Sequence, residues 1–303
     1  MSTLERTVEK EYDGIVIRQY LKEVVGLSTR LIRSASIEKR ILVNYEAVRM
    51  RKVLKSGDKI IVKLSRKESQ NIIPEKMDLD MVYEDEDILV LNKPPYMVVH
   101  PTKSHQEGTL ANGILYYFQE SNQNCIVRLV SRLDMNTSGL IIIAKNQFAH
   151  MALSKEMRSD SFKKRYIAIV HGHLKELEGT INAPIFKLED EESTFKRIVD
   201  ERGQESITHY KVIERLENAD VVECLLETGR THQIRVHLSY LGHPIFGDTL
   251  YGLGNEEDLI ERQALHAYGL DFRSPKTGKE LSLRAELPND MKELISKLKK
   301  EQV

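Results

Sequence analysis

Hydrophobic positions near the start of the chain recur with the period of a helix. Ile17, Tyr20, Leu21 and Val24 follow the i, i+3, i+4, i+7 spacing that puts four side chains on one helical face, and Gly26 is suited to end that helix. The spacing therefore predicts an amphipathic helix that begins near residue 17.

A second helix and a small sheet are predicted directly afterwards. Ser28 is a residue type that caps helix N-termini. The apolar face behind it consists of Leu31, Ile32 and Ala35. Residues 40–44 and 59–64 have the pattern of short strands, with a turn at 56–58. The sequence thus predicts a small N-terminal domain of two helices and short strands over residues 14–64.

The rest of the chain mixes strand and helix patterns. A polar stretch with Pro74 predicts a linker over residues 65–78, and a larger domain is expected over 79–303. Predicted strands are 81–84, 88–93, 140–145, 165–170, 208–213 and 220–227. Predicted helices are 110–118, 149–158, 231–241 and 291–298. Because these elements do not alternate as regular βαβ units, the expected fold class is α+β.

Positive charge is concentrated in the predicted N-terminal domain. Residues 14–64 carry twelve Lys/Arg against four Asp/Glu, a net charge of +8, although the whole chain has a net charge of −1. Local positive charge of this kind is typical of a surface that binds a polyanion such as RNA. Arg30 and Arg33 are three residues apart, so they share a face of the second predicted helix and are candidate RNA contacts.

Composition excludes several classes of protein. The chain has 303 residues, 41% hydrophobic and 30% charged, which is typical of a globular protein of about two domains. No apolar run reaches the ~18 residues of a membrane-spanning helix, and the charged start does not resemble a signal peptide. The two cysteines, Cys125 and Cys224, have no CxxC partner, which argues against a zinc site or redox pair and favours the reducing cytoplasm.

Three segments contain residues that could carry chemistry. Asp134 lies between Arg132 and a turn that precedes a buried strand, an arrangement that an Asx-turn and a surface ion pair would also explain. His232 and Arg235 are i, i+3 neighbours on a predicted helix, where a solvated polar face is the alternative. Tyr166 enters a strand and could serve packing alone. Spacing alone leaves these alternatives open, and it provides no set of metal ligands.

The segments together resemble a known family. RLDMNTSGLIIIAKN, KRYIAIVHG and ETGRTHQIRVHLSYLGHPIFGDTLYG, with NKPPYMVVHP before them and QALHAYGLDF after them, resemble the motifs of the RluA/RluD family of RNA pseudouridine synthases. The resemblance runs from about Leu79 to Pro288. The N-terminal residues resemble the S4 RNA-binding domain that is often joined to this family.

The resemblance implies both a fold and a reaction. The fold would be an S4-like domain followed by a mixed, mainly antiparallel sheet with a central cleft. The reaction would convert uridine to pseudouridine in structured RNA, by attack on C1′, attack on C6 or formation of a glycal. The family's catalytic carboxylate corresponds to Asp134, its salt-bridge partner to Arg235 and its active-site aromatic to Tyr166. Arg132 would fill the space left by a flipped base, and no metal or other cofactor is implied.

Large-subunit ribosomal RNA is the substrate expected from the resemblance, with transfer RNA as the alternative. The chain departs from the family at Ser131, often His, and at Met135, often basic, and these changes bear on which RNA is bound. A non-catalytic RNA-binding protein and an enzyme of free nucleosides are rival functions. The first would be expected to lack one of Asp134, Tyr166 and Arg235, and the second has no need of a basic domain. The sequence carries no signal for an oligomeric state.

Overall fold

A computed structural model describes residues 2–64, 70–188, 196–254 and 256–299 of the chain. The N-terminal unit contains a four-stranded antiparallel sheet of order β1-β4-β2-β3, packed against two helices. Its elements are β1 (Thr3–Thr7), the 3-10 helix η1 (Lys10–Tyr12), α1 (Ile17–Glu23), α2 (Thr29–Ile37), β2 (Ile41–Val43), β3 (Glu46–Ala47) and β4 (Lys59–Lys63).

The two predicted helices form, and the capping residue acts as expected. The Ser28 side chain accepts a hydrogen bond from the backbone N–H of Leu31 at 3.1 Å, which satisfies a free donor at the start of α2. Ile17 and Leu21 of α1 are buried against Leu31. The range 14–64 stays a prediction, and β1, which precedes it, pairs with β4. Within β1 only Leu4 is buried, so the strand shows no alternating pattern in the sequence.

The larger unit is built on a ten-stranded sheet. Eight strands follow the order β10-β13-β14-β9-β15-β8-β6-β5, with β16 paired to β15 and β7 paired to β8. The strands of this unit are β5 (Met81–Glu84), β6 (Ile88–Lys93), β7 (Arg128–Leu129), β8 (Ser138–Ala144), β9 (Lys163–His171), β10 (Glu178–Asn182), β11 (Ile185–Lys187), β12 (Arg197–Val199), β13 (Ile207–Arg215), β14 (Ala219–Leu226), β15 (Leu265–Arg273) and β16 (Glu280–Arg284). The helices are α3 (Leu110–Glu120), α4 (Gln147–Glu156), α5 (Gln233–Tyr240) and α6 (Asn289–Lys299). The α+β fold expected from the sequence is confirmed.

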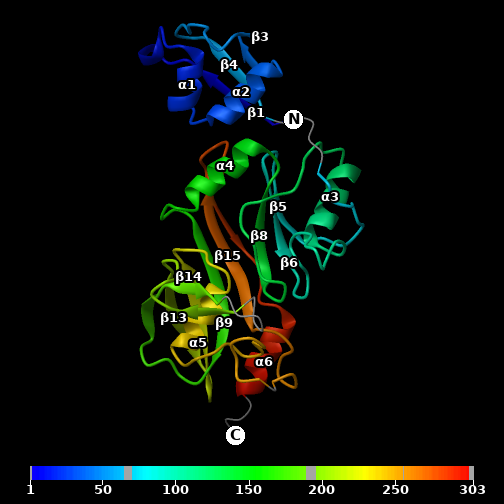
Figure 1. Cartoon of the computed structure of the whole chain (residues 1–303), viewed down its shortest axis with the longest axis vertical. Helices are drawn as coiled ribbons and strands as arrows, with labels where there is room; N and C mark the ends of the chain where they lie inside the picture. The colour runs from blue at the N-terminus through cyan, green and yellow to red at the C-terminus, as the bar shows by residue number, and fades with distance from the viewer. Residues whose placement is uncertain (1, 65–69, 189–195, 255, 300–303) are drawn as a thin grey trace.

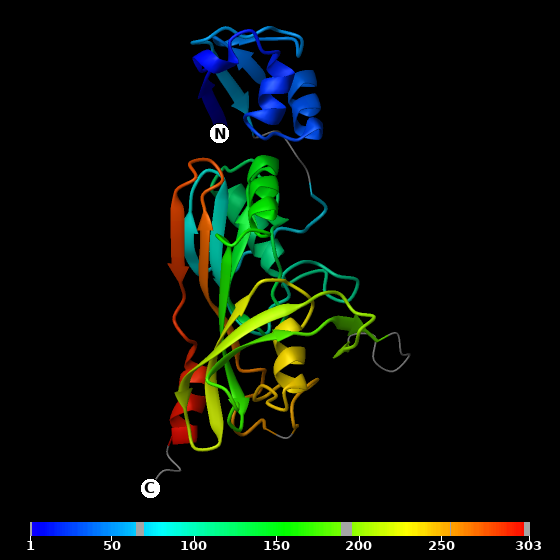
Figure 2. The ribbon, with the colours of Figure 1, turned by 90° about the vertical axis from the view of Figure 1, so that its left-hand side faces the viewer.

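Helices cover both faces of this sheet. Figures 1 and 2 show α3 and α5 on one face and α6 on the other. In β8, Ile141 and Ile143 belong to the same core cluster as α3, whereas Leu140 and Ile142 pack in the cluster that contains α4 residues. A strand that is buried on both faces reads as a continuous apolar run, which explains the sequence LIIIA.

The N-terminal unit lies at one end of the long axis, next to α4 (Figure 1). Phe148 of α4 is buried in the hydrophobic cluster of the N-terminal unit. The carboxylate of Asp87 accepts hydrogen bonds from Ser2 at 2.5 Å and from Asn146 at 2.6 Å. The two units therefore share an apolar contact and a buried polar one.

The described part of the predicted linker packs on the larger unit. Ile72 is buried in its core, and the carbonyl of Ile73 accepts a hydrogen bond from Asn112 of α3 at 2.7 Å. Residues 65–69 of that predicted linker lie outside the described residues. The limits 65–78 and 79–303 stay predictions.

A single parallel pairing joins the two halves of the main sheet. All other strand pairs in it are antiparallel, but β15 and β8 run parallel, with His266 opposite Ser138 and Ala267 opposite Gly139. Gly139 has a φ of +114°, and a Cβ there would lie 2.3 Å from the carbonyl oxygen of Ala267. Only glycine fits this joint, because both the backbone conformation and the space exclude a side chain.

We expect Gly139→Ala to lower the free energy of unfolding by at least about 3 kcal/mol, because backbone strain and overlap with Ala267 add. The matched control is Gly242→Ala, which has a φ of +84° and nothing within 4 Å of the added Cβ. It should cost only about 1 kcal/mol. Chemical denaturation measures both, and equal losses would contradict the steric argument.

Candidate active site

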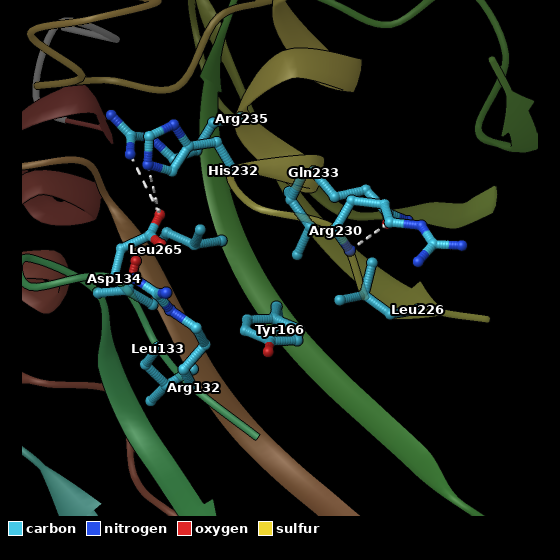
Figure 3. A pocket seen from close by; sticks show the side chains of 12 residues that line it. Arg132, Leu133, Asp134, Tyr166, Leu226, Arg230, His232, Gln233, Arg235 and Leu265 are labelled. Atoms are coloured by element: carbon cyan, nitrogen blue, oxygen red, sulfur yellow. Dashed lines mark hydrogen bonds and ion pairs between the residues drawn. The ribbon is translucent and has the colours of Figure 1, made fainter. Parts of the chain in front are cut away.

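A small pocket lies where the two halves of the main sheet meet (Figure 3). The four residues that the sequence singled out here, Arg132, Asp134, Tyr166 and Arg235, all line it. Asp134 comes from the turn before β8, Tyr166 from β9 and Arg235 from α5. Its volume is about 60 Å³, well below the ~300–1,000 Å³ of most small-molecule sites.

Two buried basic side chains fix the backbone of the turn that carries Asp134. Lys93, at the end of β6, donates to the carbonyl of Met135 at 2.9 Å. Arg262 donates to the carbonyl of Asn136 at 3.1 Å. The N–H of Thr137 donates to the carbonyl of Asp134, which closes the turn. The position of the Asp134 side chain is therefore set by the sheet and by buried side chains rather than by a free loop.

Arg235 forms a buried ion-pair network with two carboxylates. It donates to Asp248 through Nε at 2.6 Å and Nη2 at 2.8 Å, and to Asp134 through Nη1 at 3.1 Å. The Asp248 side chain is fully buried, whereas the Asp134 side chain is 21% exposed. Burial opposes the charge of Arg235, but Asp248 and then Asp134 outweigh it and raise the pKa of the guanidinium. Asp248 thus orients a permanent cation, one nitrogen of which faces Asp134.

His232 is a second partner of Asp134, which the sequence prediction did not assign to the site. Its Nε2 lies 3.8 Å from Oδ2 of Asp134. The helix predicted from residue 231 begins at Gln233, because His232 adopts a left-handed conformation with a φ of +58°. Burial lowers the pKa of His232 despite the nearby carboxylate, so its neutral form is favoured.

Tyr251 is a hydrogen-bond partner of His232. Its hydroxyl accepts a hydrogen bond from the backbone N–H of Arg197 at 2.9 Å and lies 2.9 Å from Nδ1 of His232. When the hydroxyl donates to Nδ1, neutral His232 carries its proton on Nε2, toward Asp134. Tyr251 lies near the end of the same family motif as His232, but the two residues are 19 positions apart, and only the fold brings them into contact.

Tyr166 forms the buried wall of the pocket. Its side chain stands on β9 with Leu226 and Leu265 near its ring (Figure 3). Burial, and then the charge of Asp134, raise the pKa of the phenol above its usual value, so the hydroxyl is protonated at neutral pH.

The three candidate RNA-contacting arginines lie in two places. Arg132 is exposed at the pocket, and it has no hydrogen-bond or ion-pair partner among the described residues. Arg30 and Arg33 are exposed on α2 in the N-terminal unit, so they are not part of the pocket. Figures 1 and 2 show that unit at the opposite end of the long axis from α5.

Two kinds of feature are absent from the described residues. They contain no group of three or more His, Cys, Asp or Glu side chains placed to hold a metal ion. Within the same residues, no helix has the length and apolar character needed to cross a membrane.

Comparison with known proteins shows which family the chain belongs to. Residues 87–240 match the RNA pseudouridylate synthase family, and residues 4–60 match the RluD ribosomal pseudouridine synthase N-terminal domain. An uncharacterized RNA pseudouridine synthase of Bacillus subtilis, YjbO, is 43% identical over 93% of this chain and 98% of its own length. The chain belongs to the RNA pseudouridine synthase family. It is therefore a member of a family of isomerases that act on RNA, as the resemblance of its motifs predicted.

A second relative and a solved structure are also similar to this pseudouridine synthase. The ribosomal large subunit pseudouridine synthase D of Zymomonas mobilis is 40% identical over 74% of each chain. The structure of human RNA Pseudouridylate Synthase Domain Containing 1 superposes with a TM-score of 0.57 at 29% identity, covering 69% of this chain and 83% of that one.

The network around Arg235 leads to a prediction about stability. We expect Arg235→Met to lower the free energy of unfolding by about 3–5 kcal/mol, because it leaves Asp248 charged and buried. Adding Asp248→Asn should recover part of that loss, and denaturation of the two single variants and the double variant measures the coupling.

The exposed pair Arg273–Glu280, at 3.3 Å, is the control. Arg273→Met and Glu280→Gln should each cost less than about 1 kcal/mol and add without coupling. Additive losses in both pairs would argue against a special role for burial at Arg235.

Proposed function

We propose that this pseudouridine synthase isomerises uridines in large-subunit ribosomal RNA, with Asp134 as the catalytic carboxylate. The observation that carries the assignment is the partly exposed Asp134 carboxylate, held by Arg235 inside a pocket that also contains Tyr166. Relatives whose names specify the ribosomal large subunit, 40% and 37% identical to this chain, support the choice of RNA.

The reaction needs a carboxylate but neither oxidation nor net addition of water. The bond from N1 of the uracil to C1′ of the ribose breaks, a bond from C5 to C1′ forms, and the proton on C5 is replaced by one on N1. Asp134 would attack C1′, attack C6 or assist formation of a glycal, and it is released at the end. Each route uses the carboxylate oxygens of Asp134, one of which accepts a hydrogen bond from Nη1 of Arg235 at 3.1 Å.

Tyr166 and Arg132 have separate proposed roles. Tyr166 would stack on the target uracil, and its hydroxyl, which is protonated, would assist removal of the C5 proton by passing its own proton on as it accepts that one. A uridine in folded RNA has to leave its stack, which costs a few kcal/mol. The exposed and unpaired guanidinium of Arg132 would fill the vacated space, where a planar group is suited to stacking.

His232 would complete the set as a positioning residue. Its Nε2–H faces Asp134, and we infer that it tightens onto the carboxylate oxygen when the substrate closes the pocket. Tyr251 would act through His232 by holding the required tautomer.

The N-terminal unit would dock on RNA phosphates. Its net charge of +8 over residues 14–64 supports this role, and Arg30 and Arg33, exposed on α2, are the proposed contacts. A cytoplasmic location stays a prediction.

Transfer RNA remains the alternative substrate, and a non-catalytic RNA-binding protein the alternative class. Incubation with free uridine, a transfer RNA transcript or an unmodified large-subunit transcript, followed by an assay for pseudouridine, separates these possibilities. The proposal requires product from the large-subunit transcript.

We expect Asp134→Asn to reduce pseudouridine formation in that transcript by at least about a thousandfold, because the amide keeps the shape but cannot act as the nucleophile. RNA affinity should stay within a few fold of wild type. Asp160→Asn, at an exposed position, is the control and should be fully active. A rate above about a tenth of wild type would falsify the role of Asp134.

Tyr251→Phe should change the pH dependence of the reaction. The hydroxyl donates to the neutral form of His232, so its removal raises the pKa of that histidine. Activity at low pH should then be lost at a higher pH than in wild type, and kcat should fall roughly 10–100-fold with little change in KM. Tyr240→Phe, exposed on α5, is the control. A pH profile equal to wild type would show that Tyr251 does not act through His232.

A further inference from the structure

A second cavity, which we call the hairpin groove, opens beside the catalytic pocket. It is lined by the two-stranded hairpin β11–β12, by residues 202–204 and by residues 229–231. Its volume is about 470 Å³, within the range of roughly 300–1,000 Å³ in which ligands bind. Arg230 lines both the groove and the catalytic pocket, and Figure 3 shows its side chain directed away from Asp134.

The charged residues that line this groove in the described part of the chain are basic. Lys187, Arg197, Arg202 and Arg230 line it, and none of its described lining residues is acidic. The chain as a whole has a net charge of −1, so the cations are concentrated locally. Such a concentration favours a ligand with several negative charges in a row.

The groove also offers a flat surface. The guanidinium of Arg202 lies over the ring of Phe186, 4.5 Å from its centre. Asp200 accepts from Arg202 at 2.8 Å and 2.7 Å, which holds the guanidinium plane in place. Cations along a groove combined with a stacking surface are typical of sites for single-stranded nucleic acid.

The walls of the groove are fixed and connected to the catalytic pocket. Ile185 and Gln204 exchange two backbone hydrogen bonds of 2.9 Å, and Gly203 is packed so closely that a Cβ would lie 2.4 Å from the Ile185 backbone. The N–H of Arg197 donates to the Tyr251 hydroxyl, which contacts His232. At Gly229, by contrast, an added Cβ meets nothing within 4 Å, so one wall is open backbone that a ligand can approach.

We propose that the hairpin groove binds the single-stranded RNA segment next to the target uridine. Lys187, Arg197 and Arg230 contact its phosphates, and one of its bases stacks on Phe186 and Arg202. Because Arg230 joins the two cavities, the flipped uridine enters the catalytic pocket while its neighbour occupies the groove. The inference rests on the proposed action on RNA and specifies where the substrate is recognised.

The test compares two double variants of the full chain that remove equal charge. Lys187→Ala/Arg202→Ala removes two cations from the groove. The control, Lys175→Ala/Arg273→Ala, removes two exposed cations outside both cavities, and Arg273 also has an acidic partner, as Arg202 does. The probe is an unmodified transcript of large-subunit ribosomal RNA.

The groove variant should raise KM and Kd at least about tenfold and flatten the slope of log Kd against log salt by about 0.7, since Lys187 is the one proposed phosphate contact that it removes and each such contact on a single strand contributes ~0.7. At saturating RNA its kcat should stay within about threefold of wild type, because Asp134, Tyr166 and Arg235 are untouched. Equal Kd values and slopes for the groove and control variants would overturn the proposal.

Two further variants separate stacking and shape from charge. Phe186→Ala should weaken binding roughly five- to hundredfold, as expected for loss of one stacked base, and Phe186→Tyr should restore it. Gly229→Leu keeps the charge but fills the groove, so it should weaken binding as well. Wild-type affinity for both Phe186→Ala and Gly229→Leu would exclude the groove as the RNA site.

The measurements keep the two hypotheses apart. If the wild-type protein makes no pseudouridine, the proposed function fails. The Kd values of the groove and control variants then still test whether the groove binds RNA. Competition by a polyglutamate peptide as strong as that by an oligouridylate of matched charge would overturn the choice of RNA in favour of an acidic protein partner.

Discussion

The buried guanidinium of Arg235 connects its own helix and the loop that follows it to the turn of Asp134, which is 101 residues away in sequence. It lies on α5 and holds Asp248 of the following loop with two short hydrogen bonds and Asp134 with a third. The cation cannot move away without leaving Asp248 charged in the interior, where a lone charge is very unfavourable. Asp134 therefore always faces a positive charge. Asp248 also accepts from the N–H of Tyr251, so the same ion pair positions the residue that orients His232.

The main sheet gives this network a rigid frame. Asp134 precedes β8 and Tyr166 stands on β9, and β15 lies between those two strands. The close approach of Gly139 to Ala267 fixes how far apart the two halves of the sheet are. Lys93 and Arg262 then hold the turn by donating hydrogen bonds to two of its backbone carbonyls. A catalytic group that is supported in this way keeps its geometry better than one on an unsupported loop.

Local sequence patterns predicted the elements that carry a regular signal. The cap at Ser28 and the doubly buried run in β8 are examples, because one local hydrogen bond or one continuous apolar stretch specifies each. Strand β1 was not predicted, since Leu4 is its one buried residue and gives no alternating pattern. The start of α5 was predicted at residue 231 and not at Gln233, because the left-handed conformation of His232 interrupts the helical pattern. Residues at the pocket were chosen by resemblance to family motifs rather than by physics.

Tyr251 shows why the remainder of the site was not predictable. It reaches His232 through the fold and has no spacing that signals the contact. The hairpin groove is of the same kind, because Phe186, Arg202 and Arg230 come from three separate segments of the chain.

Among the described residues, strands β11 and β12 pair with each other and with no strand of the ten-stranded sheet. Substitutions on this hairpin therefore leave the hydrogen bonds of the main sheet intact, whereas changes at Arg235, Asp248 or Gly139 disturb the frame itself. Selection can alter the hairpin in small steps at little cost to folding. Divergence among related enzymes toward different RNA targets would then begin in this appendage, while the machinery for isomerisation is inherited unchanged.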